Sequence, residues 1–316
     1  MKDLDVLCVG GIVCDLLLSP VGKFIFDQDK TELELLEQKL GGDAANEAII
    51  FGRYGMKVGL AGEMGDDMTG RGLMNYMHES GVDTSNIILR GKTRTSVVMI
   101  HENGDRNFLT YGRNTQLINI HDMSMEQLKH TRMVSIGSVH ILPTLDPDLP
   151  EYLEKAQAAG CITAADMMKR DPRVPEVDIP AIVAHCDYFL PSYIEAKELT
   201  GKDIPEEQAD EFLAWGAKNV VIKLGEEGCL VRNAQESFRT PIYKTNAVVD
   251  TTGAGDNFVA SFLTGVLKGW SHKRCAEFAS AAGSICVEKV GATAAIESLA
   301  QVEARMKEQG RFSQFE

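Results

Sequence analysis

The residue types best suited to chemistry lie in residues 248–267, VVDTTGAGDNFVASFLTGVL, where a glycine-containing turn leads into an amphipathic helix. Gly253 and Gly255 lack a Cβ, so N–H groups of the turn and of the first helical turn can face one point and bind an anion. Asp256 lies at the mouth of this predicted anion hole, which spans residues 253–256. A carboxylate there would repel a bound phosphate unless it accepts a proton from an approaching hydroxyl, as the base of a phosphoryl transfer does. An Asp that only N-caps the helix explains the loop equally well.

The sequence of this loop, DTTGAGD, closely resembles the C-terminal signature of the ribokinase-like (PfkB) carbohydrate kinases. A second stretch, LGGDAANEAIIFGRYG at residues 40–55, resembles the N-terminal GG-x-x-x-N-x-A element of that family, and the two lie at about the family's spacing. The resemblance covers nearly the whole chain. It implies ATP-dependent phosphorylation of a primary hydroxyl of a small, ribose- or fructose-like sugar. Asp256 would be the general base, with Gly253, Ala254 and Gly255 around the transferred phosphate.

For the sugar, the resemblance implies contacts from the end of the first strand, from the glycine pair and from a lid. The implied residues are Asp15, Gly41, Gly42, Asn46, Arg113 and Asp256. Asp and Asn suit this task because a carboxylate accepts hydrogen bonds from hydroxyls and an amide both donates and accepts. The alternatives are a solvated Asp15 at a strand end and an Asn46 that caps the following helix.

The nucleotide is expected at residues 220–231, VVIKLGEEGCLV, which predict a strand, a glycine turn and a second strand. This segment resembles the nucleotide-binding element of the family. The implied nucleotide residues are Lys223, Gly225, Gly228 and Gly255. Lys223 would bind phosphate as a point charge.

Two cation sites follow from the resemblance. Residues 191–201, PSYIEAKELTG, resemble the element whose Glu holds Mg²⁺ through water, which assigns Glu195 although Ser192 replaces the family's Asn. The alternative is a solvated Glu195 on a helix. A monovalent cation, K⁺, is implied near Asp250, the Thr252 carbonyl and Gly291. ATP, Mg²⁺ and K⁺ are therefore the expected co-substrate and cations.

The elements that must position these residues predict an α/β fold, with a doubly wound, mostly parallel sheet flanked by helices and a small β-sheet lid. The core is expected from residues 1–15, 41–94 and 117–316, and the lid from residues 16–40 and 95–116. Residues 31–40, TELELLEQKL, fit the period of a strand and that of a helix, and a strand is expected there because the resemblance implies a β lid. The dipeptide Asn103-Gly104 predicts a hairpin turn in the lid. Ligands bind at the C-terminal strand ends of such sheets, and four charged residues are expected there: Asp166, Glu195, Lys223 and Asp250.

Composition narrows the function classes. The chain has 316 residues, 44% of them hydrophobic, and a formal net charge of −14 with no run of Lys or Arg, which argues against nucleic acid as a partner. No apolar run reaches the roughly 18 residues of a membrane span, and the N-terminus does not resemble a signal peptide. Seven cysteines without a C-x-x-C pair are interpreted as reduced and structural. We expect a cytoplasmic protein.

Rival enzyme classes fail on spacing. A nicotinamide-binding fold needs G-x-G-x-x-G after the first strand, which Gly10-Gly11 does not supply. A P-loop would need Gly where Asn86 stands. A sugar acid, bound by Arg113 or Arg170, and a nucleoside stay open as substrates, and so does a non-catalytic sugar sensor. The protruding lid predicts a homodimer that pairs through it.

Overall fold

The computed structural model describes residues 2–22, 25–27, 29–101, 106–112, 117–170 and 176–312. The predicted Asn103-Gly104 turn and Arg113 lie outside these residues. Within them, nine strands form one large sheet: β1 (Leu4–Gly10), β4 (Val58–Met64), β5 (Val82–Leu89), β8 (Thr131–Val139), β9 (Ile162–Met167), β10 (Tyr188–Phe189), β11 (Asn219–Lys223), β12 (Cys229–Asn233) and β13 (Ser237–Thr240).

The strand order of the large sheet is β13-β12-β11-β10-β9-β8-β1-β4-β5. All neighbours pair in parallel except β11 with β12 and β12 with β13, which are antiparallel. Strand residues alternate between two buried clusters: Val6 and Cys8 belong to one, Leu7 and Val9 to the other. A parallel sheet is covered on both faces, and this alternation places apolar side chains on each. The predicted doubly wound α/β fold is confirmed.

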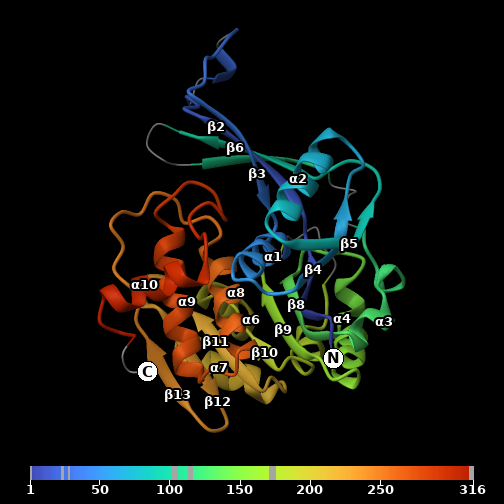
Figure 1. The fold of residues 1–316 in the computed structure, drawn as a ribbon, viewed down its shortest axis with the longest axis vertical. Helices are drawn as coiled ribbons and strands as arrows, with labels where there is room; N and C mark the ends of the chain where they lie inside the picture. The colour runs from blue at the N-terminus through green and yellow to red at the C-terminus, as the bar shows by residue number, and fades with distance from the viewer. Residues whose placement is uncertain are drawn as a thin grey trace.

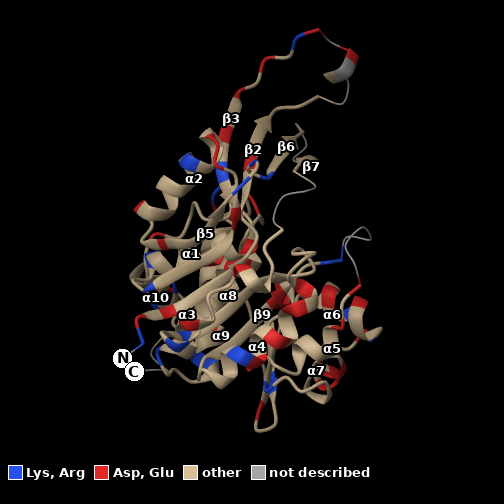
Figure 2. Cartoon of the chain, turned by 90° about the vertical axis from the view of Figure 1, so that its right-hand side faces the viewer, with Lys and Arg blue, Asp and Glu red and all other residues tan. Residues whose placement is uncertain are grey.

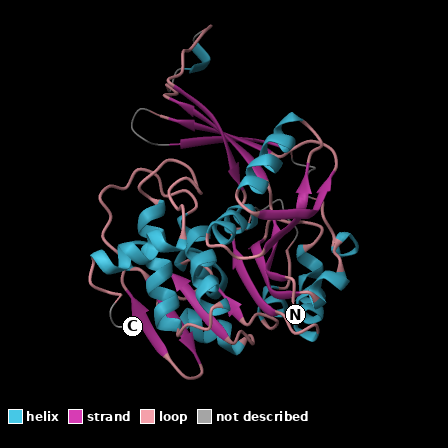
Figure 3. Ribbon diagram, viewed as in Figure 1, coloured by secondary structure: helices cyan, strands magenta, loops and turns pink. Residues whose placement is uncertain are grey.

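Helices cover both faces of the sheet (Figures 1 and 3). The first cluster includes residues of α1 (Asp43–Arg53), α2 (Met68–Glu79), α8 (Ala254–Leu267), α9 (His272–Cys286) and α10 (Leu299–Glu308). The second includes residues of α3 (Met125–Lys129), α4 (Leu149–Ala158), α5 (Ile179–Val183), α6 (Tyr193–Thr200) and α7 (Pro205–Ala214). Short 3-10 helices are η1 (Ile25–Asp27), η2 (Ile120–Asp122), η3 (Asp146–Asp148) and η4 (Gly225–Glu227).

A second, smaller sheet protrudes from the body of the molecule (Figure 1). Its strands, in spatial order, are β3 (Leu35–Gly41), β2 (Val13–Ser19), β6 (Thr95–Ile100) and β7 (Arg106–Tyr111). The strands β6 and β7 pair antiparallel, as the hairpin pattern predicts. Because β2 follows β1 closely and β3 runs directly into α1, the small sheet joins the large one at the C-terminal end of β1.

One predicted strand end is wrong. Asp250 does not follow a strand, because residues 241–250 form an extended loop between β13 and the start of α8. Val248 and Val249, the short apolar run before Asp250, are 66% and 52% exposed. Among the described residues, no helix combines the length and apolar character that crossing a bilayer requires.

Candidate active site

The N-terminal end of α8 forms a turn that tolerates no side chain at its first position. Gly253 is the N-cap and has a φ of 76°, in the left-handed region, and a Cβ on it would lie 2.4 Å from the Cβ of Ala292. Asn257, in the second turn of α8, ties this region together, because its Nδ2 donates to the carbonyl oxygens of Gly253 and Ala292 at 2.7 Å each. The N–H groups of Ala254 and Gly255 belong to the first helical turn and lack intrahelical acceptors. Sequence reasoning missed Asn257, which follows Asp256 directly.

Asp256 lies in this first turn and is only 8% exposed. It is not the N-cap, which is Gly253, so the capping alternative is wrong. Its Oδ2 accepts a hydrogen bond of 2.7 Å from Asn46 Nδ2. Burial raises the pKa of Asp256 to about 6; the bond from Asn46 opposes this rise, and the charge of Asp166 adds to it.

Asn46 belongs to the first turn of α1, whose N-cap is Gly42, so the capping alternative fails here too. Its side chain is buried, and its Oδ1 has no hydrogen-bond partner. An unpaired buried amide oxygen is costly, and a ligand hydroxyl donating to it would remove that cost. The structure thus brings Asn46 and Asp256, 210 positions apart in sequence, to one point.

Two further carboxylates lie nearby. Burial and the charges of Asp43 and Asp250 raise the pKa of Asp15 to about 6. Asp15 is close enough to Gly41 that a Cβ there would lie 2.2 Å from its Oδ2, so glycine is required at that position. Gly42 has a φ of 91°, which favours glycine as well. Burial and the charge of Asp256 raise the pKa of Asp43 to about 7.

Asp43 was not predicted from the sequence. Its side chain accepts a hydrogen bond from the Ser138 hydroxyl, and the residue is half-buried in the first turn of α1. The available signal was an acid directly after two glycines, where a helix N-terminus favours negative charge. That signal does not distinguish an acid that binds a ligand from an acid that only stabilises the helix N-terminus.

Lys223 and Asp166 form a buried ion pair at the ends of β11 and β9. The ammonium of Lys223 lies 2.6 and 2.5 Å from the two carboxylate oxygens of Asp166. Burial raises the pKa of Asp166 to about 6, and the charge of Lys223 limits that rise. Lys223 also lies 3.6 Å from the position of a Cβ on Gly255. Lys223 is therefore already paired where it approaches the anion hole, instead of being a free charge.

A cavity of about 290 Å³ adjoins the anion hole, between the β11–β12 turn, the extended loop and α9. All four residues predicted to bind nucleotide line it: Lys223, Gly225, Gly228 and Gly255. The other wall consists of apolar and small residues: Ile242, Tyr243, Val248, Phe258, Ser280, Gly283 and Val287. Sequence reasoning missed Ile242 and Tyr243 of the extended loop. Apolar walls with a charge at one end suit a flat base joined to phosphates.

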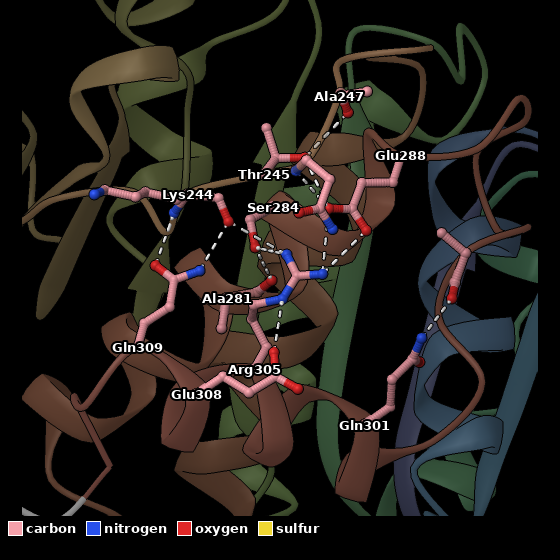
Figure 4. A network of polar contacts seen from close by, with 12 residues as sticks. Lys244, Thr245, Ala247, Ala281, Ser284, Glu288, Gln301, Arg305, Glu308 and Gln309 are labelled. Atoms are coloured by element: carbon pink, nitrogen blue, oxygen red, sulfur yellow. Dashed lines mark hydrogen bonds and ion pairs between the residues drawn. The ribbon is translucent and has the colours of Figure 1, made fainter.

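The extended loop that forms one wall is held by a polar network around Arg305 (Figure 4). Arg305 donates to both oxygens of Glu288 at 3.0 and 3.2 Å and to the carbonyl of Lys244 at 3.4 Å. Glu288 in turn accepts from the Thr245 hydroxyl at 2.9 Å. The side chain of Gln309 accepts from the backbone N–H of Lys244 at 2.9 Å and donates to the carbonyl of Lys244 at 2.8 Å. A loop without strand partners is thus fixed by side chains of α10 and of the segment after α9.

Glu195 lies in the first turn of α6, where Ser192 is the N-cap. One of its oxygens accepts from the Ser192 N–H at 2.7 Å, so residues 192 and 195 form a capping box. The other oxygen stays available for a metal-bound water, which fits the indirect Mg²⁺ contact expected from the sequence. Among the described residues, no group of three His, Cys, Asp or Glu side chains is arranged to hold a metal directly.

The residues expected around a monovalent cation do lie together. Asp250 Oδ1 accepts from the Thr252 N–H at 2.8 Å, and its Oδ2 accepts from the Gly291 N–H at 2.9 Å. Oδ1 also accepts from Arg106 of the small sheet at 2.9 Å. Although burial opposes it, these bonds keep the pKa of Asp250 below its ordinary value.

Arg170 lies apart from Asn46 and Asp256. It lines a separate cavity of about 170 Å³ between β9 and α6, together with His140, Lys169 and Glu195. Acidic side chains also gather around α6 and α7, whereas Lys and Arg are scattered in this view (Figure 2). Of the predicted sugar residues that the structure describes, all converge on the α1 and α8 N-termini.

Comparison with known proteins identifies a single domain over most of the chain. Residues 3–299 match the pfkB family carbohydrate kinase domain. The fructokinase-1 of Zea mays is 30% identical over 83% of this chain and 86% of its own length. The 5-dehydro-2-deoxygluconokinase of Geobacillus kaustophilus is 26% identical over 96% of this chain and 93% of its own.

Solved structures agree on the fold. The ribokinase of Arabidopsis thaliana, determined with ribose and ATP, superposes with a TM-score of 0.82 at 22% identity, covering 97% of this chain and 99% of that one. The fructokinase of Xylella fastidiosa with bound ATP has a TM-score of 0.81 at 22% identity, with coverages of 98% and 100%.

Proposed function

Because the chain belongs to the pfkB family of carbohydrate kinases, we propose that it transfers the γ-phosphoryl group of ATP to a primary hydroxyl of a small neutral sugar of the ribose or fructose type. The observation that carries this proposal is Asp256. It is a buried carboxylate beside a helix N-terminus, and it faces an Asn whose amide oxygen has no partner. A binding protein has no need of a base at this place, so the arrangement favours an enzyme over a sugar sensor.

In the proposed reaction, Asn46 and Asp15 hold hydroxyls of the sugar, and Asp256 accepts the proton of the attacking hydroxyl. The N–H groups of Gly253, Ala254 and Gly255 stabilise the negative charge of the transferred group. ATP occupies the cavity behind Gly255, with its base against the apolar wall. Mg²⁺, when bound near Glu195 through water, supplies charge neutralisation for the phosphates.

A neutral sugar is the preferred substrate because of the charge around the acceptor site. Burial raises the pKa of Asp15, Asp43 and Asp256. A neighbouring carboxylate adds to each rise: Asp43 and Asp250 act on Asp15, Asp256 acts on Asp43, and Asp166 acts on Asp256. A substrate carboxylate or phosphate bound against them would be repelled, whereas hydroxyls can donate to each. Fructokinases among the relatives support this class.

A sugar acid is the second candidate. Lys169 and Arg170, the cations that could bind a substrate carboxylate, line a separate cavity with Glu195, apart from Asn46 and Asp256. Relatives named 5-dehydro-2-deoxygluconokinase support this alternative. A nucleoside is the third candidate. Arg113 remains a proposed substrate contact, for a neutral sugar as for a sugar acid.

The remaining features of the proposal are pairing through the small sheet as a lid and a cytoplasmic location. The small sheet would exclude water from the attacking hydroxyl. Seven buried thiols, none in a disulfide, support a reducing compartment.

The test is ADP release from ATP with a panel of sugars, sugar acids and nucleosides at equal concentration. We expect the highest kcat/KM for a pentose or ketose. Selective turnover of a sugar acid would replace the first candidate with the second. If no compound releases ADP although ATP binds, the catalytic proposal is wrong and the sensor remains.

A further inference from the structure

One side chain of the small sheet reaches the loop that precedes the anion hole. Arg106, the first residue of β7, donates from Nη2 to Asp250 Oδ1 at 2.9 Å and from Nη1 to the Thr252 hydroxyl at 2.6 Å. The side chain of Asp250 is only 4% exposed and that of Arg106 25%. The pair is therefore shielded from solvent, and the charge of the carboxylate is neutralised by a residue from another sheet.

The other donors to Asp250 are backbone groups of its own surroundings. The Thr252 N–H and the Gly291 N–H hold one oxygen each. A carboxylate offers about four lone-pair positions, and three donors now occupy three of them. Arg106 is the donor that can leave without disrupting the loop, because it belongs to the protruding sheet.

We infer that the guanidinium of Arg106 and a monovalent cation are alternative partners of Asp250. A cation on the same carboxylate would place two positive charges within a few ångströms, beside a carboxylate whose side chain is only 4% exposed. The K⁺ site expected from the sequence therefore does not fit beside Arg106 as it lies. Arg106 neutralises the charge of Asp250 in place of the cation, and it thereby connects the small sheet to the turn at Gly253.

This inference rests on the proposed function only for its effect on turnover, since cation binding can be measured without any substrate. Thermal unfolding is followed in KCl, NaCl and choline chloride at equal ionic strength. We use the wild type, Arg106→Gln and Arg106→Met, the last of which keeps the length of the apolar stem. Lys129→Gln is the matched control, because it also removes one positive charge but from an exposed pair with Glu126.

We expect KCl to raise the Tm of both Arg106 variants by roughly 2 to 4 °C over choline chloride at ten times Kd. The wild type and Lys129→Gln should show no such rise, and adding Asp250→Asn to Arg106→Gln should abolish it. An equal K⁺ response in the wild type and the Arg106 variants would overturn the inference, and so would the absence of a response in both variants. Failure of the proposed function would appear separately, as no ADP release whatever the cation.

Discussion

Asp256 is the proposed base, and its surroundings suit that role because they bury the carboxylate and raise its pKa. Asn46 donates to it, while Asp166 and burial raise its pKa into the range where a base is half-charged near pH 6. A carboxylate exposed at a helix start would have neither the raised pKa nor the fixed orientation.

Asp256→Asn should lower kcat by about 10²- to 10⁴-fold, because a positioned base typically contributes that much. The Asn side chain can still accept from Asn46, so folding and sugar binding should persist. Turnover, calorimetric sugar binding and circular dichroism measure the three properties. Asp203→Asn, which changes an exposed side chain 74% accessible to solvent, is the control and should leave kcat unchanged. Near-normal turnover in Asp256→Asn would remove the base.

The pH profile follows from the same group. The pKa of Asp256 is raised to about 6, and a base acts only when deprotonated. Therefore kcat/KM should rise with pH up to about 6 and level off above about 7. A profile measured from about pH 3.5 to 8 with an ADP assay tests this. An acid limb near pH 4, the range of an ordinary Asp, would show that the site does not perturb the group that limits the rate.

Two helical glycines allow the effect of a substitution on stability to be distinguished from its effect on binding of the proposed nucleotide. Gly283 of α9 and Gly72 of α2 both lie within helices, and a Cβ at either would meet no atom within 4 Å. Gly283 lines the proposed nucleotide cavity, whereas Gly72 lines a different one, between α2 and β3.

Both Gly283→Ala and Gly72→Ala should raise the free energy of unfolding by about 0.5 to 1 kcal/mol, because alanine favours the helix. Only Gly283→Ala should raise KM for ATP, since its methyl group enters the cavity. Urea unfolding and ATP titration measure the two effects. Equal KM values in both variants would place the nucleotide elsewhere.

At the scale of the whole molecule, the small sheet is the feature that bears on pairing with another chain. Its outer strand β7 exposes Phe108, Leu109 and Tyr111 at 60%, 54% and 62%. Exposed apolar strand residues at a sheet edge favour pairing with another chain.

We expect a homodimer in solution, with slower amide exchange in residues 95–100 and 106–112 when sugar is bound. Leu109→Lys should give a monomer by light scattering, because a buried charge opposes the pairing. Leu89→Lys, at an exposed position of β5 on the edge of the large sheet, should remain dimeric. A monomeric wild type whose exchange ignores sugar would reject both the dimer and the lid.

The amino-acid sequence by itself determined the features that depend on local chemistry and period. Strand and helix patterns predicted the doubly wound sheet and the hairpin strands β6 and β7. Gly253 marked a turn that the structure shows to leave no room for a side chain. These signals are readable because turn geometry and side-chain period are properties of neighbouring residues.

Only the tertiary structure decided which distant groups neutralise one another. Lys223 pairs with Asp166, 57 positions away, and Arg106 with Asp250, 144 positions away. No local pattern encodes these pairs, since each depends on which strand ends the fold brings together. For the same reason the sequence did not reveal Asp43, whose pKa is raised by burial and by the charge of Asp256. It also did not reveal the extended loop at 241–250, which has no strand partner and is held by side chains such as that of Gln309 at the end of α10.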